Sequence, residues 1–240
     1  MTAMARRWII TGGSRGVGLA TAKLALERGD KVAVIARGLD PAAVRKELGR
    51  NALAFKADVS DATSVATVAA SVVDAWGGID VLVNNAGLHR GGKVDKLSLE
   101  DWHAVLAVNL TGALHCVRAV LPHMQTGGAI INIGAVVGFR GFPGDSPYGA
   151  SKAGLAGLTQ VLAIELAKRQ IRVNLVIPGW IETEMTAGLS GTARERLIAR
   201  IPMRRAGTEN EIGDVIWWVA GSTYMTGATI PTDGGLMSTF

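Results

Sequence analysis

The feature that most restricts how this chain can fold is a regular alternation of short apolar runs with longer stretches of helical character. The runs consist largely of Val, Ile, Leu and Ala, and we expect strands at residues 7–11, 31–37, 52–59, 81–85, 129–133, 172–178 and 228–233. Strands that are apolar on both faces belong to parallel sheets covered by helices. The pattern therefore predicts an α/β fold, a doubly wound parallel sheet of about seven strands with helices on both faces.

Helix start signals fall between these runs. Asp40 followed by Pro41 is typical of an N-cap with proline at the first helical position. Residues 98–101 and 208–211 have the spacing of capping boxes, in which Ser or Thr is followed three residues later by an acid. In doubly wound sheets ligands bind beyond the carboxyl ends of the strands. We therefore expect the functional residues in the segments that follow the strands.

Length and charge exclude several classes of protein. The 240 residues fit one domain over residues 1–240. The net charge is +5, but the basic residues are scattered and form no run of five, so we do not expect nucleic-acid binding. No apolar run approaches the roughly 18 residues of a membrane span. The first run, at residues 8–10, is too short for the core of a signal peptide.

The only cysteine, Cys116, has no partner for an intramolecular disulfide and excludes a zinc site built from several thiolates. It lies in an apolar stretch, so we expect it to be buried and inert. No metal ion is expected, and a cytoplasmic location in a reducing compartment is favoured.

A glycine-rich turn follows the first expected strand and precedes a helical pattern that continues to Gly29. Glycines permit a tight turn and a close approach of the backbone to a pyrophosphate, and free N–H groups at a helix start favour negative charge. The turn therefore predicts a dinucleotide cofactor. The contacts expected there are Gly12, Ser14, Arg15, Gly16, Val17 and Gly18.

The end of the second strand indicates which dinucleotide binds. An acid at this position bonds the ribose 2′-hydroxyl and repels a 2′-phosphate, which selects NAD. Here the strand ends in Arg37 without an acid, and Arg15 supplies a second guanidinium nearby. Two arginines bind a phosphate through charge-assisted hydrogen bonds. The sequence thus favours NADP(H), the alternative being that both arginines are ordinary solvated side chains.

The glycine-rich turn has the spacing T-G-x-x-x-G-x-G, and further motifs follow in order. They are Asn84-Asn85-Ala86-Gly87, Tyr148-x-x-x-Lys152, Pro178-Gly179, Thr226-Gly227 and Asp233-Gly234-Gly235. Together, over residues 7–235, they resemble the short-chain dehydrogenase/reductase family, in its 3-oxoacyl-(acyl-carrier-protein) reductase and carbonyl reductase branch. The resemblance implies a single-domain Rossmann-type fold and a homotetramer. It also implies cofactor contacts at Asp58, Val59, Asn85, Ala86, Gly87, Tyr148, Lys152, Pro178, Gly179, Ile181 and Thr183.

Tyr148 and Lys152 carry the expected chemistry. Residues four apart share one face of a helix, and an ammonium group favours the phenolate and lowers the pKa of a tyrosine from its usual value near ~10. Such a tyrosine acts as a general acid toward a carbonyl oxygen or as a base toward an alcohol. The resemblance adds that Lys152 bonds the nicotinamide ribose and that Asn109 holds a water that relays protons. A purely structural role for Asn109 is the alternative.

One position departs from the resemblance. The family has a serine 13 residues before the tyrosine, where it bonds the substrate oxygen, and this chain has Ala135, which cannot donate a hydrogen bond. The chain is then an engineered serine-to-alanine form, a natural enzyme that uses tyrosine alone or another donor such as Ser146, or a cofactor-binding protein without activity. We expect Ala135 in the substrate pocket with Tyr148 and Trp180.

The function expected is NADPH-dependent reduction of a ketone, either a 3-oxoacyl thioester or a small free ketone. The alternatives are an NADP(H)-binding pseudoenzyme and an NAD-linked alcohol or sugar dehydrogenase. The substrate wall is expected from residues 88–94, 139–147 and 180–200, with a lid at about residues 180–205. The related branch docks an acyl carrier protein through arginines. Arg169 stands where one of them would, whereas residues 125–129 lack the other.

Overall fold

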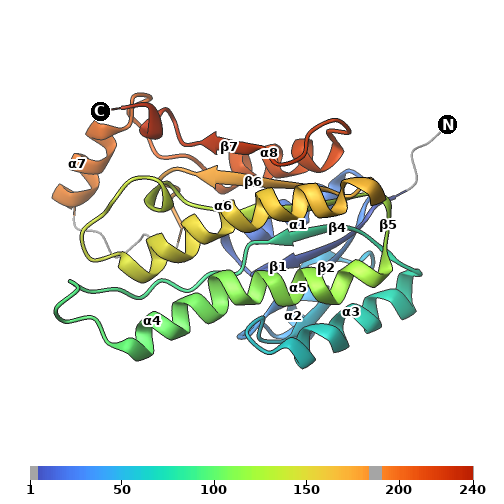
Figure 1. Ribbon diagram of the computed structural model, residues 1–240. Helices are drawn as coiled ribbons and strands as arrows, with labels where there is room; N and C mark the ends of the chain where they lie inside the picture. Colours follow the sequence, from blue (N-terminus) through green and yellow to red (C-terminus); the bar gives the residue numbers. More distant parts are fainter. Residues whose placement is uncertain (1–4, 184–190, 240) are drawn as a thin grey trace.

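The computed structural model describes residues 5–183 and 191–239. Seven parallel strands form one sheet in the order β3-β2-β1-β4-β5-β6-β7 (Figure 1). The strands are β1 (Arg7–Thr11), β2 (Lys31–Ala36), β3 (Ala52–Lys56), β4 (Ile79–Asn84), β5 (Met124–Ile133), β6 (Arg172–Pro178) and β7 (Thr229–Thr232). The predicted fold class and all seven strands are confirmed. Strand β3 ends earlier than expected and β5 begins earlier, at Met124, which pairs with Ile79 across an irregularity in register.

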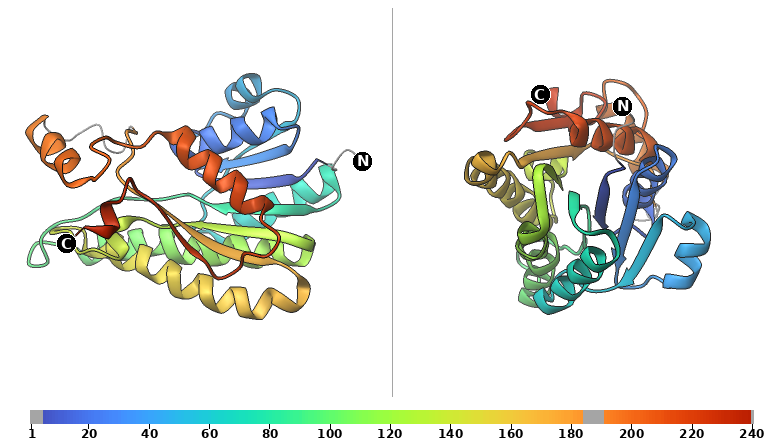
Figure 2. Two further views of the ribbon diagram at one scale, coloured as in Figure 1. Left: turned by 90° about the horizontal axis from the view of Figure 1, so that it is seen from above. Right: turned by 90° about the vertical axis from the view of Figure 1, so that its right-hand side faces the viewer.

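Helices cover both faces of the sheet, as Figure 2 shows end-on. One face carries α1 (Gly16–Glu27), α2 (Pro41–Leu48) and α8 (Glu209–Gly221). The other carries α3 (Ala62–Trp76), α4 (Leu99–Leu106), the π-helical turn η1 (Ala107–Thr111), α5 (Gly112–Val120) and α6 (Ser146–Leu166). Helix α7 (Gly191–Arg200) stands away from these layers (Figure 1). Short 3-10 turns are η2 (Leu121–His123), η3 (Val136–Gly138), η4 (Ala167–Arg169) and η5 (Leu236–Ser238).

The helices begin where their capping side chains predict. Asp40 accepts a hydrogen bond from the Ala42 N–H at 2.9 Å, which starts α2. Thr208 and Glu211 close the capping box of α8 in both directions. At Ser98 the structure gives the single bond from the residue 101 N–H, so the capping box expected there is a simple N-cap.

The apolar core forms one layer on each side of the sheet, because the strand side chains alternate between the two faces. Trp8 is fully buried in one layer, and its indole N–H donates to Asp30 Oδ2 at 2.8 Å. Cys116 is buried in the other, and burial raises the pKa of its thiol to about 12. The expected burial of this thiol is therefore confirmed, and its inertness stays a prediction.

The continuous helical run Leu99–His123, which comprises α4, η1, α5 and η2, is long and apolar enough to cross a membrane, with a mean hydropathy of 1.6. However, 44% of the 18-residue segment that has this hydropathy is buried inside the protein, where α5 packs on α3 and α4 packs on α6. Core helices pass the same length and composition test, so the run is weak evidence for a membrane span.

The order of the strands fixes the position of the site. β1 lies between β2 and β4, so the connections that leave β1 and β4 diverge to opposite sides of the sheet. A crevice opens beyond the carboxyl ends of two such strands. The glycine-rich turn after β1 and the Asn-Asn-Ala-Gly segment after β4 therefore meet at this edge.

Candidate active site and cofactor site

Hydrogen bonds tie the ends of β1 and β4 together at the floor of the crevice. Thr11 Oγ1 accepts the backbone N–H groups of Asn85 at 3.0 Å and Ala86 at 2.9 Å. The Asn85 amide donates in return to the carbonyl oxygens of Thr11 at 3.0 Å and Gly12 at 3.2 Å. The two segments predicted to hold the cofactor are thus fixed to each other.

Two glycines of the turn leave no room for a side chain. Gly12 has φ +64°, and a Cβ there would lie 2.9 Å from Asn85 Nδ2. A Cβ at Gly18 would lie 2.3 Å from the carbonyl oxygen of Gly12. The first turn of α1 holds no acidic residue of its own, and the Glu209 carboxylate of α8 comes to 3.6 Å from a Cβ position at Gly16. This backbone cradle fits the pyrophosphate of a dinucleotide.

Basic side chains lie where the ribose end of the cofactor is expected. Arg15 is the N-cap residue of α1, and Arg37 follows β2 directly. The Arg37 guanidinium lies 3.7 Å from Asp58 Oδ2. Partial burial raises the pKa of Asp58, but hydrogen bonds from Ser60 and the charge of Arg37 outweigh it, so the net pKa is lowered. Val59 is buried just beyond, with its carbonyl oxygen 3.1 Å from His115 Nδ1.

A buried amide network, not anticipated from the sequence, connects the centre of the sheet to α6. Asn84 of β4 donates to Asn132 Oδ1 at 2.9 Å, and Asn132 of β5 donates to Thr159 Oγ1 at 2.9 Å. Thr159 in turn donates to the backbone of α6 at Leu155. The sequence signal for this network was the presence of three polar residues in otherwise apolar segments. The network fixes α6, and hence Tyr148, against β4 and β5.

Asn109 lies in the π-helical turn η1 and is buried. Its Oδ1 accepts the Leu88 N–H at 2.7 Å, and its Nδ2 donates to the Leu88 carbonyl at 3.0 Å. The same Nδ2 donates to Ser151 Oγ at 3.0 Å, and Ser151 donates to the Tyr148 carbonyl at 2.8 Å. The side chain therefore has the structural role considered above. The water relay stays a prediction.

Tyr148 and Lys152 lie on one face of α6, as predicted, with Lys152 Nζ 5.5 Å from the centre of the Tyr148 ring. The lysine is only 3% exposed, and its amine donates to the carbonyl oxygen of Ile133 at the end of β5 at 2.7 Å. The Cβ position of Gly87 lies 3.9 Å from Lys152 Nζ. The pair therefore borders the crevice beside the segment after β4.

The two pKa values correct one expectation. Burial raises the pKa of the Tyr148 phenol to about 12, and the negative charge of Asp145 adds to this effect. Burial lowers the pKa of Lys152 to about 8. The predicted lowering of the tyrosine pKa by the ammonium group is therefore wrong for this protein. Desolvation of the phenolate is the main cause, and the carboxylate of Asp145 acts in the same direction.

Ala135 lies two residues after the end of β5 and is half-buried at the start of η3. A Cβ at Gly138, three residues on, would lie 2.9 Å from the backbone of Lys152, so this turn packs against α6. Ser146, the alternative donor, is the exposed first residue of α6. It precedes Tyr148 by two positions, and residues two apart on a helix do not face each other.

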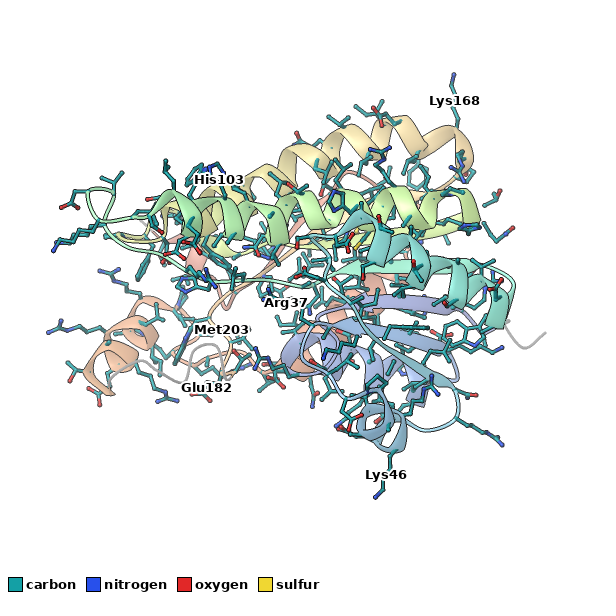
Figure 3. The ribbon with its side chains drawn as sticks, turned by 90° about the horizontal axis from the view of Figure 1, so that it is seen from below. Arg37, Lys46, His103, Lys168, Glu182 and Met203 are labelled. Atoms are coloured by element: carbon teal, nitrogen blue, oxygen red, sulfur yellow. The ribbon has the colours of Figure 1, made fainter. Side chains whose placement is uncertain are left out.

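The segment after β6 completes the edge of the site. Gly179 packs against the backbone of Asp233, where a Cβ would lie 2.5 Å from its Cα. Trp180 is 9% exposed, and the Arg194 guanidinium of α7 lies 5.5 Å from its ring. Arg194 also pairs with Glu182, which Figure 3 labels beside α7. Ile181 forms a bridge with Gly207, and Thr183 ends the described segment. Residues 184–190 of the expected lid lie outside the described residues.

His89 and Asp145 are site residues that the sequence reasoning missed. His89 Nε2 lies 3.0 Å from Asp145 Oδ1, and the His89 ring stands edge-on to the Tyr148 ring at 5.0 Å and 74°. The signal available was a histidine two residues after the Asn-Asn-Ala-Gly motif. Across residues 5–183 and 191–239, no group of three or more His, Cys, Asp or Glu side chains could hold a metal ion.

Comparison with known proteins agrees with this geometry. A family model described as enoyl-(acyl carrier protein) reductase matches residues 12–237. The 3-oxoacyl-[acyl-carrier-protein] reductase FabG of Thermotoga maritima is 42% identical over 95% of this chain and 96% of its own length. Carbonyl reductase family member 4 of Xenopus tropicalis is also 42% identical, over 95% of this chain and 96% of its own.

Solved structures give the same result. A short-chain dehydrogenase/reductase mutant from Serratia marcescens superposes with a TM-score of 0.92 at 34% identity, covering 97% of this chain and 98% of its own. A blue fluorescent protein from a metagenomic library, solved in complex with NADPH, superposes with a TM-score of 0.91 at 32% identity, covering 96% and 97%.

Proposed function

Because the chain belongs to the short-chain dehydrogenase/reductase family, we propose that it reduces a ketone to an alcohol with NADPH, using Tyr148 as general acid. It is an oxidoreductase that uses NADP(H) and acts on carbonyl or alcohol groups. The observation that carries the specific proposal is the pairing of Tyr148 with buried Lys152 beside the crevice.

The residues divide the chemistry between them. NADPH, when bound, supplies a hydride to the carbonyl carbon. Tyr148 gives its phenolic proton to the carbonyl oxygen, and a pKa of about 12 keeps that proton on the phenol at neutral pH until it is needed. Lys152, with a pKa near 8, keeps a proton close to the phenol and can return it after turnover. Asn109 and Ser151 hold this part of α6 in place.

The cofactor contacts proposed are those that line the crevice. The cradle of Gly12 and Gly18 supports pyrophosphate binding, and the absence of an acid at the end of β2, with Arg37 in its position, supports binding of a 2′-phosphate. This charge pattern disfavours the alternative of an NAD-linked alcohol or sugar dehydrogenase. Contacts of Asp58 with the adenine and of Ile181 and Thr183 with the nicotinamide carboxamide belong to the same proposal.

The substrate is proposed to enter between residues 88–94, 139–147 and 180–200, with α7 forming part of a lid at about residues 180–205. Both a 3-oxoacyl thioester and a small free ketone suit the site. Docking of an acyl carrier protein would use Arg169, whose guanidinium is bonded to the Leu121 carbonyl at 2.8 Å and so is partly committed within the chain. A cytoplasmic homotetramer, one domain per chain, completes the proposal.

The test is NADPH oxidation with a panel of carbonyl compounds, including a 3-oxoacyl thioester, small ketones and an enoyl thioester. We expect the parent protein to oxidise NADPH when a ketone is present, and Ala135→Ser to do so with a higher kcat. Tyr148→Phe should lose this ketone-dependent oxidation. Removing one oxygen-directed donor costs other enzymes about 10²–10³ in rate.

Two outcomes would contradict the proposal. Turnover of the enoyl thioester alone would assign C=C reduction. Binding of NADPH by both the parent and the Ala135→Ser protein, without oxidation by any ketone, would assign a cofactor-binding protein.

A further inference from the structure

Two loops meet beside Tyr148 and are fastened to each other. The Gly92 N–H donates to the Gly144 carbonyl at 2.8 Å, and a Cβ at Gly91 would lie 2.2 Å from the same oxygen. His89, three residues before Gly92, has its Nε2 3.0 Å from Oδ1 of Asp145, the residue after Gly144. The loop after β4 therefore carries a histidine that the loop before α6 holds in one orientation.

This histidine stands at the tyrosine proposed to protonate the substrate. Its ring is edge-on to the Tyr148 ring, with centroids 5.0 Å apart. The side chain of His89 is 44% exposed, so the ring reaches solvent-accessible space while one nitrogen is held by Asp145. The imidazole therefore stands beside the phenol ring that the substrate oxygen is proposed to approach.

Among the residues that the structure describes, the other groups near the tyrosine are less well placed to donate a second hydrogen bond to that oxygen. Ala135 has no donor, and Ser146 lies two positions from Tyr148 on the helix. The Lys152 amine is buried and bonded to the Ile133 carbonyl. Of the side chains whose contacts with the Tyr148 ring are described, His89 remains.

We propose that His89, oriented by Asp145, donates a hydrogen bond to the substrate carbonyl oxygen beside Tyr148, in place of the missing serine. This inference rests on the proposed ketone reduction. The carbonyl carbon accepts the hydride, the carbonyl oxygen takes the phenolic proton of Tyr148, and His89 keeps its own proton throughout. His89 therefore stabilises the developing oxyanion without a net proton transfer.

The donor form of the ring is the imidazolium, which donates from both nitrogens, Nε2 to Asp145 and Nδ1 to the substrate. The charged and titratable groups around it are Asp145 before α6, Tyr148 and Lys152 on α6, and Arg90, which pairs with the residue 101 carboxylate of α4 at 3.0 Å. A serine does not titrate, so the two donors differ in their pH dependence.

The experiment compares kcat/KM and NADPH binding for the parent, His89→Phe, Ala135→Ser and the double variant. Phenylalanine keeps an aromatic ring against Tyr148 but has no N–H. The matched control is His103→Phe, since His103 is exposed on α4 (Figure 3). We expect His89→Phe to lower kcat/KM by about 10²-fold and leave NADPH binding unchanged. Ala135→Ser should restore most of this loss in the His89→Phe background and add less than tenfold to the parent.

The pH profile gives a readout that a structural role would not move. The dependence of kcat/KM on pH should differ between the parent and the double variant, because an imidazole donor can lose its proton as the pH rises and a serine donor does not. Asp145→Asn, which removes the orienting carboxylate, should lose less activity than His89→Phe and be rescued by the same serine. This variant tests the idea even if His89→Phe unfolds.

Two results would overturn the inference. In the first, His89→Phe and Asp145→Asn turn over ketones at the parent rate while Tyr148→Phe is inactive. That result would leave the proposed function intact. The other is equal losses from His89→Phe with and without the serine. If no protein of the set, Ala135→Ser included, shows oxidation that depends on Tyr148, the proposed function itself has failed and the role of His89 with it.

Discussion

Replacing Arg37 with alanine tests the assignment of cofactor preference most directly. The Arg37 side chain is 54% exposed, so its interaction with a phosphate is screened as in water. Two unit charges about 4 Å apart then interact by about 1 kcal/mol. A phosphomonoester carries about −1.5 to −2 at neutral pH, so the loss is about 1.5–2 kcal/mol. Since about 1.4 kcal/mol is tenfold in affinity, the Kd for NADPH should rise by about 10–30-fold.

The carboxylate that Arg37 leaves behind adds to this effect. Asp58 Oδ2 lies 3.7 Å from the guanidinium, and without Arg37 its charge faces the phosphate. Asp58→Asn in the Arg37→Ala background should therefore recover part of the affinity. NADH has no 2′-phosphate, so its Kd should change by less than about twofold, within the scatter of exposed charge interactions.

The assay is titration of NADPH and NADH by fluorescence or calorimetry at about 0.1 M salt, where the Debye length is about 10 Å. Lys46→Ala is the matched control, because it removes the same charge from α2, where Figure 3 shows the side chain pointing away from Arg37. An equal loss of NADPH and NADH binding in Arg37→Ala would refute the reasoning, as would an equal effect of Lys46→Ala.

Three further predictions concern stability and charge. Gly18→Ala should cost about 1–3 kcal/mol of unfolding free energy and weaken NADPH binding, because its Cβ would lie 2.3 Å from the Gly12 carbonyl; urea unfolding and cofactor titration measure both. Asp30→Ala should cost about 1–3 kcal/mol in urea unfolding, because the buried Trp8 indole N–H loses its acceptor. For Lys152, a pKa of about 8 against an ordinary 10.5 means that charging the buried amine destabilises the folded chain below pH 8. The unfolding free energy of the parent should therefore rise relative to Lys152→Met as pH increases from about 8 to 10.5, where the unfolded chain keeps the proton and the folded chain loses it.

Each of these has a control within the chain. Gly157 is exposed on α6 with nothing within 4 Å of a Cβ, so Gly157→Ala should stabilise by about 0.5–1 kcal/mol. Asp74→Ala, at an exposed position of α3, should change stability by less than about 0.5 kcal/mol. A stability difference between parent and Lys152→Met that stays constant with pH would show that the amine is not desolvated as described.

Much of the fold was predictable because its signals are local. Apolar runs bounded by turns indicate buried parallel strands whatever the rest of the chain does, and the caps at Asp40 and Thr208 act within one helical turn. The glycine-rich turn is also local, since the tight approach of Gly18 to Gly12 involves residues six apart. Motif order then indicated the family, and the spacing of four residues brought Tyr148 and Lys152 to one helix face.

The balance of charge at the site was not predictable in this way. The spacing of four residues suggested that Lys152 would lower the pKa of Tyr148, but burial of the phenol and the charge of Asp145 raise it instead. Desolvation depends on every element packed around a group, and no local pattern reports it.

His89 shows the same division more sharply. Nothing in its neighbourhood along the chain relates it to Asp145, 56 residues away, or to Tyr148. The sequence by itself determined the sheet, the glycine-rich turn and the shared helix face of Tyr148 and Lys152, because these depend on short-range sterics and on periodicity. Only the tertiary structure decided what surrounds the tyrosine, because loops from different strands meet there and the contact depends on how the whole sheet orders them.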